Sequence, residues 1–200
     1  MTHSSSYGYF VHAYRRTEGL IHLSRGLSGV ALGEVDVQDA NRAAIVMGVS
    51  ALDAYIHDLV VEAVLEAHFG KRYKTKSYKQ VKVSIDVCDS ISVRIWDILA
   101  QEIRSMFSRS TFQRSDELEK ALRFVDNKKG KWSRIGNEIG GSPQYLRGKL
   151  DSIVDRRNMI VHEADIDPTT QRPRPLDINE VEQAITFIKN LAYGIDLAFW

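Results

Sequence analysis

The chain reads IVMGVSALDAYIHDLVVEA from Ile45 to Ala63, and this stretch decides its fold. Apolar residues recur at positions 45, 49, 52, 56, 59 and 63, in alternating steps of four and three, which places them on one face of an α-helix. With its flanks the pattern predicts a helix of about 30 residues, well above the average length. Several small residues along it let a second helix approach closely: Gly48, Ser50, Ala51 and Ala54. We therefore expect the central helix of a bundle.

Helical periodicity continues through the rest of the chain. An apolar stripe covers residues 178–199 behind a capping-box pair, and Ser142-Pro143 is a typical helix start, followed by apolar residues up to Ile153. Shorter helices are expected over 8–27, 89–107, 116–126 and 132–139, whereas strand signals are weak. The sequence predicts one all-α bundle, residues 1–200, with a long early helix and a long C-terminal helix. We expect its core over residues 38–199, a helical N-terminal extension over 1–35 and a basic loop over 71–84.

Composition excludes several classes of protein. The 200 residues include 27 basic and 26 acidic side chains, so a net charge of +1 gives no global attraction to nucleic acid. A single cysteine, Cys88, excludes an internal disulfide, and the histidines lack metal-ligand spacing, so we expect no metal and no cofactor. Residues 1–9 carry no apolar signal core, and no apolar run approaches the roughly 20 residues of a membrane span. We expect a soluble cytoplasmic protein.

Two basic stretches stand out against this neutral background. Residues 71–82 hold six cations and no acid, interleaved with tyrosines, and residues 128–134 hold four cations around a tryptophan. Cations hold phosphates and aromatic rings stack on bases, so this mixture favours single-stranded nucleic acid, although a solvated loop is the simpler alternative. The residues predicted to contact RNA here are Lys71, Arg72, Lys74, Lys76, Lys129, Lys131 and Trp132.

Reactive side chains are concentrated in residues 155–165, which read DRRNMIVHEAD. Arg157 is a permanent cation, and His162 can take or give a proton near neutral pH. Asn158 and His162 are four residues apart and share a helix face. Arg157 continues the apolar stripe, where a charge is costly unless it is paired or meets a partner, which suggests a groove or a dimer interface. The alternative is a solvated helix end with ordinary side-chain pairs.

The run Arg157-Asn158-Met159-Ile160-Val161-His162 resembles the signature of the HEPN superfamily. That signature is an arginine, a polar residue, three spacers and a histidine, on a helix late in a small helical bundle. Residues 50–60 resemble the early long helix of the RiboL-PSP-HEPN group, and residues 132–150 are similar to that group as well.

The resemblance implies a metal-independent endoribonuclease that acts on RNA as a homodimer with a composite active site. The ribose 2′-OH would attack the adjacent phosphodiester and leave a 2′,3′-cyclic phosphate and a 5′-OH. His162 would act as general base or acid, Arg157 would hold the phosphate, and Asn158 would orient the histidine or donate to the phosphate. Acidic residues on the early helix often assist in this family, which points to Asp53. Arg156 would help to steer phosphates.

Several alternatives remain open. Asp53 would otherwise form an ordinary intrahelical pair with His57. The resemblance fits a toxin or phage-defence effector with an antitoxin or regulatory partner. HEPN toxins paired with a minimal nucleotidyltransferase carry a tyrosine where this chain has Ala164, which disfavours that partnership. Residues 135–146 resemble a helix-turn-helix, which predicts a DNA-binding regulator instead. An inactive HEPN domain would serve in dimerisation or RNA binding.

Overall fold

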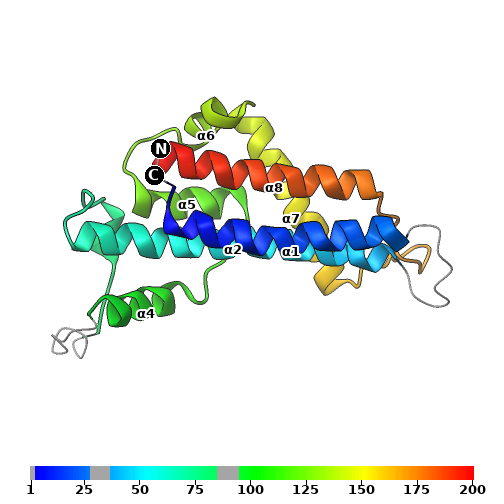
Figure 1. The fold of residues 1–200 in the computed structure, drawn as a ribbon, viewed down its shortest axis with the longest axis horizontal. Helices are drawn as coiled ribbons and strands as arrows, with labels where there is room; N and C mark the ends of the chain where they lie inside the picture. Colours follow the sequence, from blue (N-terminus) through cyan, green and yellow to red (C-terminus); the bar gives the residue numbers. More distant parts are fainter. Residues whose placement is uncertain (1–2, 28–36, 85–94) are drawn as a thin grey trace.

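The computed structural model describes residues 3–27, 37–84 and 95–200 (Figure 1). Within these ranges the chain is helical and pairs only in one isolated bridge, Ile166 with Pro173, which confirms the predicted all-α bundle. The expected helix over 89–107 is seen from residue 95, and its first six residues lie outside the described ranges. The elements are α1 (Ser5–Leu27), α2 (Gln38–His68), the 3-10 helix η1 (Ser77–Gln80), α4 (Ile95–Phe107), α5 (Ser115–Val125), α6 (Lys131–Ile139), α7 (Pro143–His162) and α8 (Ile178–Phe199).

Helix α2 is the centre of the bundle and packs against α1, α4, α5, α7 and α8. Its predicted apolar face is fully buried at Leu52, Ile56 and Leu59. A methyl group at Gly48 would come within 2.5 Å of Ile185 Cδ1, so the Ile185 side chain packs directly on the α2 backbone and would have to shift for any larger residue. Of the other small residues, Ala51 is buried, whereas those at 50 and 54 remain exposed. The helix therefore presents one face to the core and leaves a small-residue face open.

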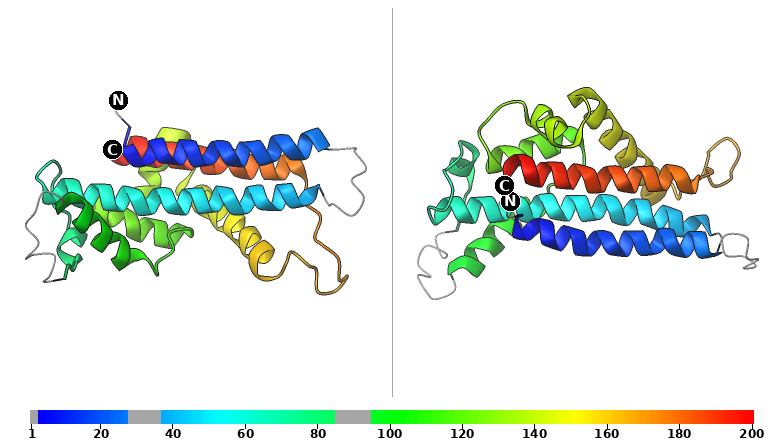
Figure 2. Two further views of the ribbon diagram at one scale, coloured as in Figure 1. Left: turned by 60° about the horizontal axis from the view of Figure 1, so that its bottom comes forward. Right: turned by 45° about the horizontal axis from the view of Figure 1, so that its top comes forward.

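Helix α1 belongs to the core, which corrects its description as an extension. In both views of Figure 2 it runs beside α2, and the left view shows it along α8 as well; α1 has contacts with both helices. Phe10 and Tyr14 are buried in the common apolar core. The N-terminal end is held as well, because the buried Asp196 of α8 accepts hydrogen bonds from His3 (2.5 Å) and from the backbone and hydroxyl of Ser4.

By length and composition alone, α2 could also cross a membrane. An 18-residue window of this helix has a mean hydropathy of 1.6, and 61% of that window is buried inside the protein. A buried core helix passes the same test, so this is weak support for a membrane span.

The predicted N-cap residues are found at the starts of α7 and α8, although the described contacts do not include the Glu180 half of the capping-box pair at α8. Ser142 caps α7, and its hydroxyl accepts the backbone N–H of Tyr145 at 3.2 Å. Asp177 caps α8 and accepts the N–H of Asn179 at 2.9 Å. Caps satisfy N–H groups that have no partner inside the helix, and here they set where the two helices begin. The start of α7 in turn determines where the reactive residues fall at its other end.

Candidate functional site at the end of helix α7

The residues of the Arg157–His162 motif lie in the last two turns of α7. His162 is the final helical residue and is exposed. Arg157 is partly buried and donates from Nη1 to Oδ1 of Asn158 at 3.0 Å. Because the Asn158 carbonyl is used in this way, its amide N–H groups are left to face a ligand or the histidine. The arrangement places a cation, an amide and an imidazole on one exposed helix end.

The neighbouring arginines, Arg156 and Arg157, have different surroundings. Arg156 donates to the carboxylate of Asp165 at 2.9 Å and reaches the carbonyl of Pro175 at 3.3 Å. Arg157 makes no ion pair with any acid in the described ranges, whereas the buried Nε atoms of both arginines have no hydrogen-bond partner there. A guanidinium with unused donors is suited to a phosphate. Arg156 is occupied inside the protein, so we remove it from the proposed RNA surface.

Asp165 organises the chain directly after the motif. It is completely buried, and one carboxylate oxygen accepts from both Arg42 Nε and Arg156 Nη2, each at 2.9 Å. We call Asp165, Arg42 and Arg156 the Asp165 cluster. Ala164 and Asp165 have φ values of 51° and 59°, a left-handed conformation that is unfavourable for non-glycine residues. The buried ion pairs hold this turn against its strain, and with it the end of α7.

Asp53 of α2 is engaged with a loop rather than with the motif. Its carboxylate accepts the backbone N–H of Phe112 at 2.7 Å and the side-chain amide of Gln113 at 3.1 Å. His57 lies 3.8 Å away, which is the alternative intrahelical pair, and its ring also contacts Phe112. Within the described residues no hydrogen bond or ion pair joins Asp53 to Arg157 or to His162. In this monomer Asp53 positions the segment before α5.

The structure separates the predicted RNA-binding residues into buried and exposed ones. Trp132 is 3% exposed and Lys131 is 3% exposed, so neither can stack on a base or hold a phosphate at the surface. Lys131 Nζ donates to the carbonyl of Asp126 at 2.5 Å, and burial lowers the pKa of this lysine to about 8. We therefore remove both from the proposed RNA surface.

The cations of the other basic stretch, residues 71–82, also differ in exposure and contacts. Arg72 donates to the carbonyl of Phe199 at 2.7 Å and lies over the ring of Trp200, so it ties the loop to the end of α8. Lys71, Lys74 and Lys76 are exposed and remain proposed RNA contacts.

Helices α6 and α7 correspond to the predicted helix-turn-helix, but the second helix is a core helix. Leu146 is 2% exposed, Leu150 is completely buried, and α7 continues for 20 residues. A methyl group at Gly136 would press against the carbonyl oxygen of Gly141, so the glycines serve the close packing of this turn. A recognition helix must be free to enter a groove, so this packing disfavours the DNA-binding alternative.

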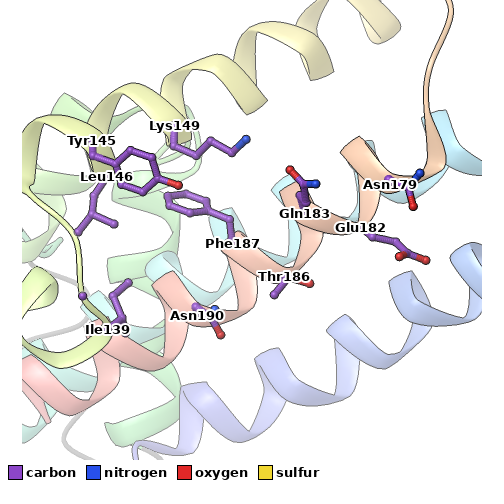
Figure 3. A pocket seen from close by; sticks show the side chains of 11 residues that line it. Ile139, Tyr145, Leu146, Lys149, Asn179, Glu182, Gln183, Thr186, Phe187 and Asn190 are labelled. Carbon is purple, nitrogen blue, oxygen red and sulfur yellow. The ribbon is translucent and has the colours of Figure 1, made fainter.

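Two hollows lie between α7 and α8. One, of about 540 Å³, sits near the start of α7, where Tyr145 and Phe187 lie across from each other with Lys149 beside them (Figure 3). Tyr145 and His162 are separated by 17 helical residues, about 25 Å, so this hollow is remote from the motif. The other, of about 650 Å³, is lined by Arg156 and by Met159, a spacer residue of the motif itself.

Residues that could hold a metal ion do not gather anywhere in the described ranges, where no group of three or more His, Cys, Asp or Glu side chains is found. A family model described as RiboL-PSP-HEPN matches residues 13–200 of the chain. No curated protein and no solved structure matches it. The match includes most of α1, in agreement with the place of this helix in the core.

Proposed function

Because the chain belongs to the RiboL-PSP-HEPN family, we propose that it is a metal-independent endoribonuclease whose site contains Arg157, Asn158 and His162. Family membership points to a nuclease or another RNA-related function. The observation that supports this site most strongly is the contrast between the two arginines. Arg156 is held by Asp165, whereas Arg157 has no acidic partner in the described ranges and lies little more than one helical turn from an exposed histidine.

The proposed reaction needs only the groups at this helix end, taken from two copies of the chain. His162 takes the proton of the ribose 2′-OH, the 2′-oxygen bonds to phosphorus, and the 5′-oxygen leaves with a proton from a second acid. Arg157 holds the non-bridging oxygens as negative charge develops on them. Asn158 donates its free amide hydrogens to the phosphate or to the imidazole. The products are a 2′,3′-cyclic phosphate and a 5′-OH.

A second copy of the chain would supply the second acid. We propose a homodimer in which two α7 ends face each other, so that each copy contributes one His162. Val161 is 45% exposed and Ile160 is partly exposed, so this face offers apolar side chains to a second copy. An antitoxin or regulatory partner would act by blocking this face.

The test is cleavage of single-stranded RNA by purified protein, with and without EDTA, beside His162→Ala and Arg157→Ala. We expect cleavage that survives EDTA, yields cyclic phosphate ends and disappears in both variants. His12→Ala, at an exposed histidine of α1, is the matched control and should retain activity. Cleavage that requires a divalent ion, or that persists in His162→Ala, would refute the proposed site.

The other outcomes decide between the remaining alternatives. RNA binding and dimerisation without cleavage would identify an inactive module. A role as a toxin or phage-defence effector predicts that expression in cells stops growth or blocks phage, and that His162→Ala does neither.

A further inference from the structure

A basic pocket of about 430 Å³ lies at the end of the bundle where α5 ends and α6 begins. Its lining brings together two stretches that are about 50 residues apart in the sequence. Five of the residues that line it are cations: Lys76, Arg123, Lys128, Lys129 and Lys131. We call this hollow the basic pocket. Arg123 and Lys128 were not among the residues predicted to contact RNA.

Specific hydrogen bonds hold the two stretches together. The backbone N–H of Lys76 donates to the side chain of Asn127 at 2.8 Å, and the hydroxyl of Thr75 donates to the carbonyl of Phe124 at 3.3 Å. Tyr73 donates its hydroxyl to Asp126 and accepts the N–H of Asn127 at 3.1 Å. The positions of the cations are therefore fixed by the fold rather than by two independent loops.

The acids of the basic pocket do not neutralise its exposed cations. Glu119 is paired with Arg147 at 2.8 Å, and Asp126 is paired with Arg134. Burial alone would raise the pKa of Asp126, but its hydrogen bonds and the nearby cations lower it below its ordinary value, so it stays ionised in these contacts. The four exposed cations, Lys76, Arg123, Lys128 and Lys129, make no ion pair within the described ranges. Several like charges around one hollow attract an anion.

The first turn of α6 adds to this attraction. Gly130 precedes the helix in a left-handed conformation, no side chain caps the helix, and its first turn contains no acid. Uncapped N–H groups and the positive end of the helix dipole both favour an anion at this end. Tyr73 is 53% exposed beside the pocket and offers a ring for stacking. Phosphates together with bases match this combination better than a simple anion does.

The basic pocket is remote from the motif. Arg134, in the first turn of α6, donates to the carbonyl of Ala198 near the end of α8, whereas Arg156 reaches the carbonyl of Pro175 just before α8 starts. Helix α8 has 22 residues, which corresponds to about 33 Å. Figure 1 shows the same separation, with α6 beside the end of α8 and the last turns of α7 toward the other end of the molecule.

We propose that the basic pocket binds phosphates of a single-stranded RNA at a point remote from the scissile bond, and so anchors strands long enough to reach it. The identity of the ligand as the substrate strand rests on the proposed ribonuclease function. The anchoring site itself rests on the pocket, its unpaired cations and the neighbouring tyrosine.

The test measures binding of a fluorescein-labelled single-stranded RNA of about 16 nucleotides at several salt concentrations. The protein carries His162→Ala, so that the RNA is not cleaved during the measurement. The pocket variant carries Lys76→Gln, Lys128→Gln and Lys129→Gln. The control variant carries Lys120→Gln, Lys149→Gln and Lys189→Gln, which change the net charge equally on other surfaces. Three lost phosphate contacts reduce the slope of log K against log salt by about 2, and we expect about tenfold or more weaker binding near physiological salt.

The control variant should bind within about twofold of the parent. Equal weakening in both variants, or none in the pocket variant, would overturn the proposal. Displacement of the RNA by a free nucleoside triphosphate as readily as by unlabelled strand would also overturn it, and would indicate a nucleotide site instead.

A cleavage assay on the pocket variant with His162 intact separates the two proposals. We expect the pocket variant to raise KM and leave kcat unchanged, because its lysines do not touch the reacting phosphate. Pocket-dependent binding without any cleavage by the parent chain would refute the ribonuclease and leave the anchoring site standing.

Discussion

Replacing Asp165 with asparagine perturbs one buried carboxylate on which the end of α7 depends. The side chain is completely buried, and one of its oxygens accepts from both Arg42 and Arg156 at 2.9 Å. Asparagine has nearly the same shape and keeps one acceptor, but it removes the negative charge. Two guanidinium groups then share a neutral carbonyl, and the left-handed turn at Ala164 loses its main restraint.

The magnitude follows from the two charge-assisted hydrogen bonds. Each contributes about 1.5–3 kcal/mol, so the pair contributes about 3–6 kcal/mol. A neutral acceptor keeps roughly half of this, which leaves an expected loss of about 1.5–3 kcal/mol. That loss is a large part of the total stability of an ordinary domain, which is about 5–15 kcal/mol.

Urea unfolding followed by circular dichroism measures this loss directly. Asp167→Asn is the matched control, because Asp167 lies two residues away and its carboxylate is exposed, accepting the backbone N–H groups of Thr169 and Thr170. We expect the control to unfold at nearly the parental urea concentration. If Asp165→Asn changes the free energy of unfolding by less than about 0.5 kcal/mol, the range of an ordinary surface substitution, the Asp165 cluster does not hold the turn.

Further predictions concern packing, capping and pH. Gly136→Ala would press a methyl group against the carbonyl of Gly141 and cost about 1–3 kcal/mol of stability. Gly148→Ala, with nothing within 4 Å of the added methyl group, should stabilise α7 by about 0.5–1 kcal/mol. Thermal unfolding of the two variants and the parent measures both changes. Ser142→Ala removes the cap of α7 and should cost about 1 kcal/mol in urea unfolding. Burial lowers the pKa of Lys131 to about 8 from 10.5, so between these pH values the unfolded chain binds more protons than the folded chain, and stability rises with pH. Lys131→Met should abolish this contribution when urea unfolding is followed across the same window, and an unchanged pH dependence would contradict it.

The helices were predictable because their signals are local. The apolar steps of α2 and the Ser142-Pro143 start of α7 each depend on residues within one or two turns, and the structure confirms both elements. The position of Trp132 also had a local signal, since Trp132, Ile135 and Ile139 recur at helical spacing and mark a core face. The neighbouring lysines outweighed this pattern and led to the wrong prediction that the tryptophan contacts RNA.

The roles of the charged residues were not predictable in the same way. Arg156 and Arg157 are adjacent in the sequence, and only the left-handed turn beyond the helix brings Asp165 back to one of them. Asp53 likewise receives a loop from 59 residues further along the chain. Such contacts depend on tertiary structure, so spacing rules within one helix do not detect them. Whether Arg157, Asn158 and His162 are catalytic is a prediction that the cleavage experiment decides.

The place of α8 between α1, α2 and α6 has a consequence for how the protein is made. Helices α1 and α2 are neighbours in the sequence and can pair as soon as both have left the ribosome, but the contact of Ile185 with Gly48 forms only after α8 has been made. Chains are synthesised from the N-terminus, and α8 is the last helix to be made. The packing around α2, on which α7 rests, is therefore completed only near the end of translation. If Arg157 and His162 cleave RNA as proposed, a nascent chain would carry them past ribosomal RNA before the packing that aligns them exists.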